Sequence, residues 1–364
     1  MNKKKLLLIN WRDIKNPEAG GAEIYYHELF RRLAGTEFDI TVLSHNFPGA
    51  PHRETIDGIN VIRHGGKWLF NYEIISWLLR EHRNYDLIIE DLNKIPFLTP
   101  LYLKCNRLHL VMHFFGKEIF REALFPAALY VFCMEKLVPR FYKKERFVAI
   151  SESTAREIEQ FPVPQSRISI VEPGIDCSYY YPTSPKSDPP VIAFMGRLMK
   201  YKNAQFIIKM LPRLRSSVPG CTVEIGGTGE YLTALQHIAT QCGVAEHVRF
   251  LGRISEEAKR DLLSRASLFV NPSAKEGWGI NNIEANLCGT VSLSSNVPGL
   301  RDSVDDGKTG VLYTPGDADD FHEKAVRLLT DHTERSAMEK AARKRALEFD
   351  WDHMARKLAD YLRT

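Results

Sequence analysis

The feature that most constrains the fold is an alternation, repeated along the chain, of short apolar runs with longer helical patterns. The short runs are hydrophobic at nearly every position, as in Leu6–Ile9 and Val191–Phe194. Strands built from such runs must be covered on both faces. Alternating strands and helices with buried strands are typical of parallel sheets flanked by helices. We therefore expect an α/β chain with Rossmann-like, doubly wound sheets.

The alternation stops once and then restarts, which predicts two domains. The chain has 364 residues, of which 44% are hydrophobic, and this is more than one core usually organises. The stretch 172–190 is too rich in proline and polar residues to continue a sheet. We expect domains at 1–175 and 190–347 with a linker at 176–189. The remaining residues, 348–364, form a helix that is expected to pack back on the N-terminal domain.

The apolar runs set the expected strands. In the N-terminal domain these are Lys5–Asn10, Asp39–Leu43, Asn60–Arg63, Asp86–Glu90, His109–His113 and Phe147–Ile150. In the C-terminal domain they are Val191–Met195, Thr222–Ile225, Val248–Leu251, Leu268–Val270 and Thr290–Leu293. Helices are expected after Gly21, around Tyr72–His82, after Ser151 and over Trp351–Leu362.

Charge and cysteine content exclude several functional classes. With 49 basic and 45 acidic residues the net charge is +4, which is too balanced for a chain that coats nucleic acid, so no nucleic-acid partner is expected. The six cysteines are far apart without a C-x-x-C motif, so neither a zinc site nor a disulfide framework is indicated. Reduced thiols in a cytoplasmic protein are the expectation.

Two apolar stretches resemble membrane-directed segments but are too short. Residues 1–10 are basic and then apolar, like the start of a signal peptide, but the run ends at Trp11, so a buried strand is expected instead. The longest uncharged apolar stretch, Ala123–Met134, is well below the roughly 20 residues that cross a bilayer.

Glycine-rich turns follow predicted strands, at the ends where open α/β sheets bind ligands. Gly20 and Gly21 permit close backbone approach, and the first amide groups of the next helix favour a diphosphate. An ordinary helix-starting turn explains this pair equally well. The turn Gly226–Glu230 is a weak signal, because it lacks the full dinucleotide fingerprint.

Basic residues mark the turn after Val191–Met195. Arg197 and Lys202 lie five residues apart and can neutralise adjacent phosphates through charge-assisted hydrogen bonds. Two cations near a helix start oppose the helix dipole, and an anionic ligand removes this cost. A ligand is therefore favoured over a solvated surface.

Two glutamates bound the strongest signal, the run Glu276–Glu284. If a helix begins near Gly279, its first amide groups form an anion cradle. Glu276 then precedes the helix and Glu284 lies inside it, so that one carboxylate can bind sugar hydroxyls and the other a ribose diol. The alternative is that both glutamates are solvated charges.

Taken together, these residues resemble the family 4 retaining glycosyltransferases, whose two Rossmann-like domains form the GT-B fold. The resemblance is carried by Gly20–Glu23, Gly196–Leu198 with Lys202, Gly227–Gly229, Phe250–Gly252, and Glu276 with Glu284. It implies two domains facing each other across a cleft. It also implies transfer of a hexosyl group from a UDP- or GDP-sugar to a hydroxyl of a saccharide or lipid-linked acceptor.

The resemblance implies a role for each motif residue. Arg197 and Lys202 would hold the donor diphosphate, Glu276 the hydroxyls of the transferred sugar, and Glu284 the ribose. Further donor contacts would come from Gly20, Gly21, Gly229, Arg253, Ile254 and the backbone of Gly277, Trp278, Gly279 and Ile280. His113, at the end of its predicted strand, matches the active-site histidine of the family. Without the resemblance, a strand-end histidine bonded to backbone explains it better.

Neither a metal nor a cofactor other than the donor substrate is expected. Asp317-Ala318-Asp319 resembles the carboxylate motif of metal-dependent transferases, but it opens a helical pattern, so Asp317 is predicted to be a helix cap. No carboxylate pair suits a nucleophile with a separate acid/base group. The resemblance implies front-face substitution instead, in which the leaving phosphate takes the acceptor's proton.

The segment 114–146 combines aromatic and aliphatic residues with a basic end formed by Lys136, Arg140, Lys143, Lys144 and Arg146. Apolar anchors beside cations suit an anionic membrane surface, which predicts a peripheral protein on the inner face of the membrane. A buried helix with a solvated basic edge needs the same composition and is nearly as well supported.

Two other functions are compatible with parts of the pattern. A nucleotide-sugar epimerase or dehydrogenase needs a first-strand G-x-G-x-x-G, which Leu6–Gly21 does not supply. A non-catalytic nucleotide-sugar-binding module would keep base and ribose contacts but lose phosphate activation. The presence of Arg197, Lys202 and both glutamates favours the enzyme.

Overall fold

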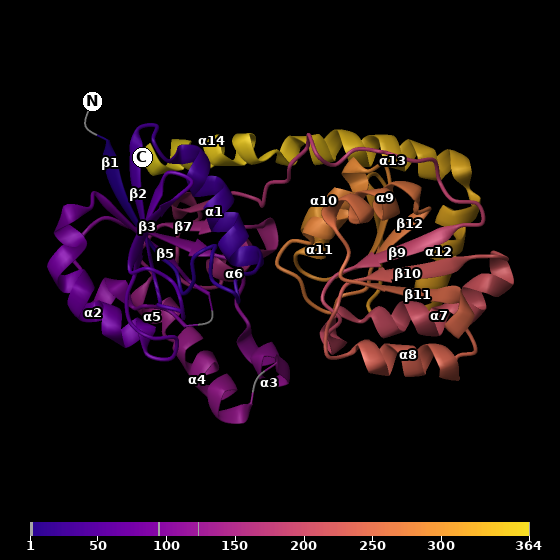
Figure 1. Cartoon of the computed structure of the whole chain (residues 1–364), viewed down its shortest axis with the longest axis horizontal. Coiled ribbons are helices and arrows are strands. Elements are labelled where there is room, and N and C mark those ends of the chain that lie inside the picture. Colours follow the sequence, from indigo (N-terminus) through magenta and orange to yellow (C-terminus); the bar gives the residue numbers. More distant parts are fainter. Residues whose placement is uncertain (1–2, 94, 123, 364) are drawn as a thin grey trace. The chain divides into compact units, whose positions relative to one another are not determined.

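A computed structural model describes residues 3–93, 95–122 and 124–363. These residues form two compact units, shown in Figure 1. The first unit runs up to Gly174 and resumes at Trp351, and the second is Ile175–Asp350.

The first unit is built on one eight-stranded sheet in the order β3-β4-β2-β1-β5-β6-β7-β8. Neighbouring strands are parallel, except that β3 pairs antiparallel with β4. The strands are β1 (Lys4–Ile9), β2 (Phe38–Ser44), β3 (Arg53–Ile56), β4 (Ile59–Arg63), β5 (Leu87–Asp91), β6 (Arg107–Val111), β7 (Phe147–Ala149) and β8 (Ile168–Ile170). The central strands are buried along most of their length, as their largely apolar sequences predict.

Helices flank this sheet. They are α1 (Gly21–Leu33), α2 (Phe70–Glu81), α3 (Ile119–Glu122), α4 (Phe125–Glu135), α5 (Val138–Phe141), α6 (Glu152–Glu159) and α14 (Trp351–Arg363), with 3-10 turns at His82–Asn84, Thr99–Leu101, Gly116–Glu118 and Gln165–Arg167. α14 packs against α1 within this unit. It buries Met354, Leu358 and Leu362 on one face, because its apolar residues recur at helical spacing.

The second unit contains a six-stranded sheet whose paired strands are all parallel, in the order β11-β10-β9-β12-β13-β14. Its strands are β9 (Val191–Met195), β10 (Thr222–Gly226), β11 (Val248–Gly252), β12 (Leu268–Asn271), β13 (Ser292–Ser295) and β14 (Gly310–Tyr313). Its helices are α7 (Ala204–Ser217), α8 (Leu232–Gln241), α9 (Glu256–Arg265), α10 (Ile280–Leu287), α11 (Leu300–Ser303), α12 (Ala318–Thr330) and α13 (His332–Ala346), with 3-10 turns at Lys200–Lys202, Ala245–His247 and Leu347–Phe349.

Both sheets have the doubly wound topology, which confirms the expected fold class. In the first unit β1 lies between β2 and β5, and in the second β9 lies between β10 and β12. Strand order therefore reverses beside β1 and beside β9. In open α/β sheets, ligands bind at the carboxyl ends of the strands flanking such a reversal. We therefore expect a donor site in the loops after β9 and β12.

The segment 176–189, expected as a linker, lies along the second unit. Thr183 N donates to Ser264 Oγ at 3.1 Å, and Ser187 N donates to Arg265 O at 2.8 Å. The ammonium group of Lys186 reaches the carbonyl oxygen of Ser264 at 3.1 Å. These contacts attach the segment to α9, so it is part of the unit's packing.

Two strand boundaries differ from the predictions in ways that matter for the site. β6 ends at Val111, so His113 lies in the loop beyond the strand and not at its end. β13 begins at Ser292 and ends at Ser295, two residues later than predicted, because small polar residues continue the buried strand. None of the helices in the described residues is long and apolar enough to cross a membrane.

Candidate functional site

Backbone hydrogen bonds join the loops after β9, β10 and β11 at one edge of the second sheet. The bonds run from Gly196 N to Gly226 O (3.1 Å), from Leu198 N to Thr228 O (2.9 Å) and from Gly227 N to Gly252 O (2.7 Å). This edge is therefore a connected backbone surface and not three independent loops.

Two glycines in this edge are required by close contact. A Cβ atom on Gly227 would lie 1.9 Å from the carbonyl oxygen of Gly196, and one on Gly229 would lie 2.3 Å from the carbonyl oxygen of Leu198. Gly227 also has φ +133°, a conformation that favours glycine. Gly229 was predicted as a donor contact, and this packing supplies a structural reason for the residue.

The two predicted diphosphate ligands occupy different settings after β9. The guanidinium group of Arg197 is exposed and makes no hydrogen bond or ion pair with any residue that the structure describes. Lys202 ends the 3-10 turn Lys200–Lys202, two residues before α7. Its ammonium group forms an ion pair with Oε1 of Glu276, and each side chain is less than one fifth exposed.

Glu276 is held from the loop that follows β12. Oε1 of Glu276 accepts a second hydrogen bond from the hydroxyl of Ser273 at 2.8 Å. The same loop is tied to the β9 loop by Ala274 N, which donates to Tyr201 O at 2.9 Å. The structure thus brings Lys202 and Glu276 together across the point where strand order reverses.

α10 begins next to this ion pair. Gly279 is its N-cap with φ +83°, and a Cβ there would lie 2.7 Å from Cδ2 of Leu300, so glycine is required. Asn281 donates from Nδ2 to Met195 O at 2.8 Å, which joins the helix start to the end of β9. The predicted helix start near Gly279 is confirmed, and free amide groups at a helix start are able to bind an anion.

The residues on either side of Gly279 contribute differently. Trp278 is buried, and its ring packs edge-on against Phe349 with centroids 4.9 Å apart. Its predicted donor contact, like that of Gly277, therefore depends on backbone atoms. Ile280 is 38% exposed, so its side chain remains available at the helix start.

Glu284 is buried and ion-paired, so the alternative of a solvated helix residue is wrong. Its side chain is 8% exposed, and Oε1 lies 2.7 Å from the ammonium group of Lys259 on α9. Burial raises the pKa of Glu284, and the nearby Lys259 charge opposes that rise without cancelling it. Oε2 is buried without a hydrogen-bond partner among the described residues.

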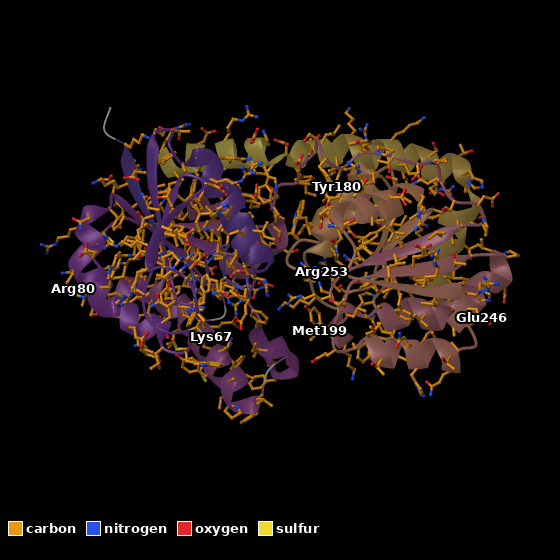
Figure 2. All side chains as sticks on the ribbon, in the orientation of Figure 1. Lys67, Arg80, Tyr180, Met199, Glu246 and Arg253 are labelled. Carbon is orange, nitrogen blue, oxygen red and sulfur yellow. The ribbon has the colours of Figure 1, made fainter. Side chains whose placement is uncertain are left out.

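Two of the predicted donor contacts, Arg253 and Ile254, follow β11. Arg253, labelled in Figure 2, has an exposed side chain. The side chain of Ile254 is close to Gly226, since a Cβ on that glycine would lie 3.3 Å from Cδ1 of Ile254. Ile254 therefore borders the glycine edge.

The remaining predicted site residues belong to the first unit. Gly20 is the N-cap of α1, and its amide donates to Oε2 of Glu23 at 2.7 Å. Apart from its chain neighbours and the backbone of its own helix, no described atom lies within 4 Å of the place a Cβ on Gly21 would occupy. Packing inside the unit therefore does not demand glycine at Gly21, which leaves room for a ligand to approach the backbone.

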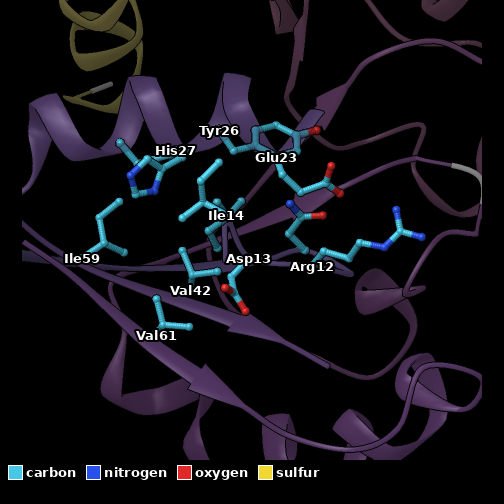
Figure 3. Close-up of a pocket in the computed structure, with 12 residues that line it drawn as sticks. Arg12, Asp13, Ile14, Glu23, Tyr26, His27, Val42, Ile59 and Val61 are labelled. Carbon is cyan, nitrogen blue, oxygen red and sulfur yellow. The ribbon is translucent and has the colours of Figure 1, made fainter. Parts of the chain in front are cut away.

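A small cavity of about 20 Å³ lies beside this helix start. Figure 3 shows Glu23, Tyr26 and His27 from α1 lining it with Ile14 from the loop after β1. The volume suits about one water molecule and is far too small for a nucleotide sugar.

His113 lies in a loop whose backbone is held by carboxylates. Its ring is 4.5 Å from that of Phe115. Glu135, at the end of α4, accepts hydrogen bonds from the amides of Phe115 and Gly116, both at 2.8 Å. Phe114 N donates to Glu157 at 3.2 Å. The loop carrying His113 is thus fixed by α4 and α6.

The segment 114–146 is broken into α3, α4 and α5 and is not one interfacial helix. Ala123, inside this segment, lies outside the described residues. Several apolar side chains here are exposed: Phe120 (38%), Leu124 (84%), Phe125 (68%), Leu129 (42%) and Tyr130 (37%). α4 is therefore not the fully buried helix of the alternative prediction.

One cation of the predicted basic end is not available to a membrane. Arg146 donates to Tyr361 O at 2.8 Å, and its guanidinium lies 4.5 Å from the centre of the Tyr361 ring on α14. The sequence pattern does not reveal this contact, because the helix that supplies it is distant in the chain. Lys136, Arg140, Lys143 and Lys144 are exposed.

Asp317 is the N-cap of α12, as predicted. Its Oδ1 accepts hydrogen bonds from the amides of Asp319 and Asp320, both at 3.0 Å. Among the described residues, no group of three or more histidine, cysteine or acidic side chains is placed to hold a metal ion.

Three site-building residues were missed by the sequence analysis. Asn281 lies inside the glutamate-bounded run and could have been considered as a helix-start residue. Ser273 and Lys259 carry no such signal, because their partners, Glu276 and Glu284, are identified only once the strands and helices are packed.

Comparison with known proteins agrees with this architecture. The family described as "Glycosyltransferase Family 4" matches residues 19–179, and that described as "Glycosyl transferases group 1" matches residues 182–345. A GDP-mannose-dependent alpha-(1-6)-phosphatidylinositol monomannoside mannosyltransferase from Mycolicibacterium smegmatis is 26% identical over 372 aligned positions, covering 95% of each chain.

Solved structures share the fold. Sucrose-phosphate synthase from Thermosynechococcus elongatus has a TM-score of 0.77 at 19% identity, covering 99% of this chain and 98% of that one. Anabaena HepE in complex with UDP-glucose has a TM-score of 0.75 at 19% identity, covering 98% and 99%. The chain therefore belongs to the family 4 glycosyltransferases of the GT-B fold, retaining enzymes that transfer a sugar from a nucleotide-sugar donor.

Proposed function

We propose that this enzyme transfers a hexosyl group from a GDP- or UDP-sugar to a hydroxyl of a lipid-linked or saccharide acceptor, by front-face substitution and without a divalent metal. The observation that carries the proposal is the Lys202–Glu276 ion pair beside the start of α10. It combines a cation, a carboxylate and free helix amides at the sheet position where such folds bind ligands.

The chemistry requires stabilisation of a departing nucleoside diphosphate. Negative charge develops on the diphosphate as the glycosyl bond breaks, and preorganised cations and amide dipoles lower that barrier. Arg197 has no side-chain partner among the described residues, so its guanidinium can bind phosphate with both of its donor edges. Lys202 is held in place by Glu276 and supplies a second positive charge.

Glu276 and His113 are proposed to bind the transferred sugar. With Oε1 of Glu276 occupied by Lys202 and Ser273, the second carboxylate oxygen remains to accept a sugar hydroxyl. The assignment of His113 follows the family resemblance, and the carboxylate-held loop at 114–116 gives that histidine a fixed backbone setting. The leaving phosphate is proposed to take the proton of the acceptor hydroxyl.

The relatives suggest which donor and acceptor to test first. The Mycolicibacterium relative is named for GDP-mannose and a phosphatidylinositol monomannoside, and HepE was solved with UDP-glucose. We propose GDP-mannose and UDP-glucose as first donors and a glycolipid as first acceptor.

A lipid acceptor fits an exposed apolar surface on the first unit. Leu124 and Phe125 are 84% and 68% exposed, and the exposed lysines 136, 143 and 144 belong to the same segment. Apolar anchors with nearby cations bind anionic bilayers, each cation adding about 1 kcal/mol. We propose that this surface attaches the enzyme peripherally to the membrane.

The test is a donor screen that detects release of nucleoside diphosphate, run with and without membrane extract. The proposal expects turnover with one GDP- or UDP-hexose, stimulated by extract, and loss of turnover in the Arg197→Ala/Lys202→Ala double variant. A fully active double variant would overturn the assigned diphosphate site.

A further inference from the structure

Lys259 is placed to control Glu284 in a way the mechanism above does not use. Its ammonium group lies 2.7 Å from Oε1 of Glu284 and 3.5 Å from Oε2 of Glu256. It also lies 5.4 Å from the centre of the Tyr180 ring. Tyr180, labelled in Figure 2, donates its hydroxyl hydrogen to Glu256, so a ring and two carboxylates fix the lysine.

Only one of the two carboxylate oxygens of Glu284 has a hydrogen-bond partner among the described residues. Oε1 is occupied by Lys259, whereas Oε2 is buried and has no hydrogen-bond partner among the described residues. An acceptor left unpaired inside a protein costs about 1–3 kcal/mol, and more when it is charged. A hydrogen-bond donor from outside the chain is needed to pair this oxygen.

The ionised state of Glu284 depends on its single cation. The groups that face it are Lys259 and Glu256 from α9, Tyr180 from the segment before β9, and Cys288 at the C-cap of α10. Among these four, only Lys259 carries positive charge. Without it, burial and the Glu256 charge would favour protonation of Glu284, and a protonated carboxyl is a poorer hydrogen-bond acceptor.

We propose that Lys259 is a positioning residue that keeps Glu284 anionic and reserves its free oxygen for a ribose hydroxyl of the donor, so that the enzyme selects ribonucleotides over 2′-deoxyribonucleotides. This inference rests on the proposed function, because it takes the nucleotide sugar as the ligand and Glu284 as its ribose contact. The new element is the control exerted by Lys259.

The experiment measures binding of GDP, 2′-deoxy-GDP, UDP and 2′-deoxy-UDP to the full chain by calorimetry at pH 7 and pH 9. The variants are Lys259→Met, Lys259→Arg and Glu284→Gln. Lys308→Met is the matched control, because Lys308 forms an exposed ion pair with Asp305 in the same unit. Thermal midpoints are recorded for each, so that a folding defect is separated from a binding defect.

The wild type is expected to bind its preferred ribonucleotide at least about tenfold more tightly than the 2′-deoxy analogue, as a charged hydrogen bond would give. In Lys259→Met the ratio should fall below about threefold at pH 7 and be larger at pH 9 than at pH 7, because higher pH favours the ionised carboxylate. Lys259→Arg should keep the ratio. Glu284→Gln should lose it at both pH values, and this isosteric change remains informative if Lys259→Met does not fold.

Two results would overturn the inference while leaving the proposed function intact. One is a wild type that binds ribo- and deoxyribonucleotides equally, as expected if a water molecule satisfies Oε2. The other is a Lys259→Met variant that keeps the full ratio at pH 7. Failure of the wild type to bind either GDP or UDP would instead contradict the proposed function itself.

Discussion

Lys202 and Glu276 form an ion pair that joins the loop after β9 to the loop after β12. The two residues are 74 positions apart in the chain, and the parallel sheet brings them to the same edge. Arg197 lies on the same β9 loop but has no partner within the described structure. Arg197 and Lys202 therefore differ in structural role, because only Lys202 is paired with another described side chain. Substitutions of the two residues test this difference.

Substitution of Arg197 by alanine should reduce activity without reducing stability. The side chain contributes no contact inside the described chain, so the thermal midpoint should stay within about 1 °C, as for most neutral surface changes. Removing one preorganised donor from a developing oxyanion costs about 10²–10³-fold in kcat. Turnover is measured as nucleoside diphosphate release. Lys209→Ala, an exposed lysine on α7, is the control and should be fully active.

Lys202→Ala should lower both the activity and the thermal midpoint, because it leaves the partly buried Glu276 without its cation. A stability loss in Arg197→Ala, or none in Lys202→Ala, would contradict this division of roles.

The strands of both units show how much secondary structure the sequence pattern can predict. Val191–Met195 is apolar at every position, and the predicted and observed strands coincide. The edge strands β3 and β8 of the first unit and β14 of the second were missed, because each has only three or four residues. β14 is buried and apolar and was missed on length alone, whereas β3 is also polar and largely exposed. A short, half-exposed strand has no continuous apolar run and resembles a loop.

The site residues likewise divide into those that a local sequence motif identifies and those that only tertiary contacts reveal. Arg197, Lys202, Glu276 and Glu284 lie in motifs that are continuous in sequence, so they could be named in advance. The Lys259–Glu284 pair, the burial of Trp278 against Phe349 and the stacking of Arg146 on Tyr361 all join distant segments. Such contacts depend on tertiary packing, which local pattern does not encode.

Two glycines predicted to serve the donor should respond oppositely to alanine. Gly229→Ala places a Cβ 2.3 Å from the carbonyl oxygen of Leu198, so backbone must move, and we expect a loss of about 2 kcal/mol or more. Gly21→Ala meets open space at a helix start, so stability should be unchanged. If a diphosphate approaches Gly21, kcat/KM should fall about tenfold. Thermal midpoints and kcat/KM distinguish these outcomes, and a fully active Gly21→Ala variant would remove Gly21 from the donor site.

The exposed residues at the start of α4 should determine membrane binding. Leu124→Ser/Phe125→Ser removes two side chains that are 84% and 68% exposed, so folding should be unaffected. Each buried side chain contributes about 1.5–3 kcal/mol to insertion, and co-sedimentation with anionic liposomes should weaken more than tenfold. Leu347→Ser, an exposed leucine in the second unit, is the control. Equal binding by all three proteins would argue against this surface.

Removal of divalent metal should leave transfer unchanged. Arg197 and Lys202 supply the positive charge at the proposed diphosphate position. The carboxylate of Asp317 caps α12, and that of Asp319 is ion-paired with Arg213. Activity is compared with excess EDTA and with added Mg²⁺ or Mn²⁺. A loss of more than about tenfold in EDTA, restored by one metal, would contradict the proposal.

A buried histidine in the first unit should make stability depend on pH. His109 lies between two carboxylates, with Nε2 3.3 Å from Glu145 and Nδ1 3.5 Å from Glu90. Burial alone would lower its pKa, but the hydrogen bond to Glu145 and the negative charge of Glu90 outweigh burial and raise it. Burial would likewise raise the pKa of Glu145, but hydrogen bonds from His109 and Arg107 lower it to about 2.

Because the folded pKa of His109 is above its unfolded value of about 6.5, its protonated form stabilises the fold fully below that value, and the contribution is lost as pH rises through the folded pKa. Lys186 affects stability in the opposite direction. Burial lowers its pKa to about 8, so the cost in stability of burying the charged lysine decreases as pH rises above that value. Urea midpoints of the wild type and His109→Gln at pH 6, 7, 8 and 9 separate the two effects, because both proteins retain Lys186. The advantage of the wild type over His109→Gln should shrink steadily with pH, and a constant advantage would show that His109 is neutral between its two carboxylates.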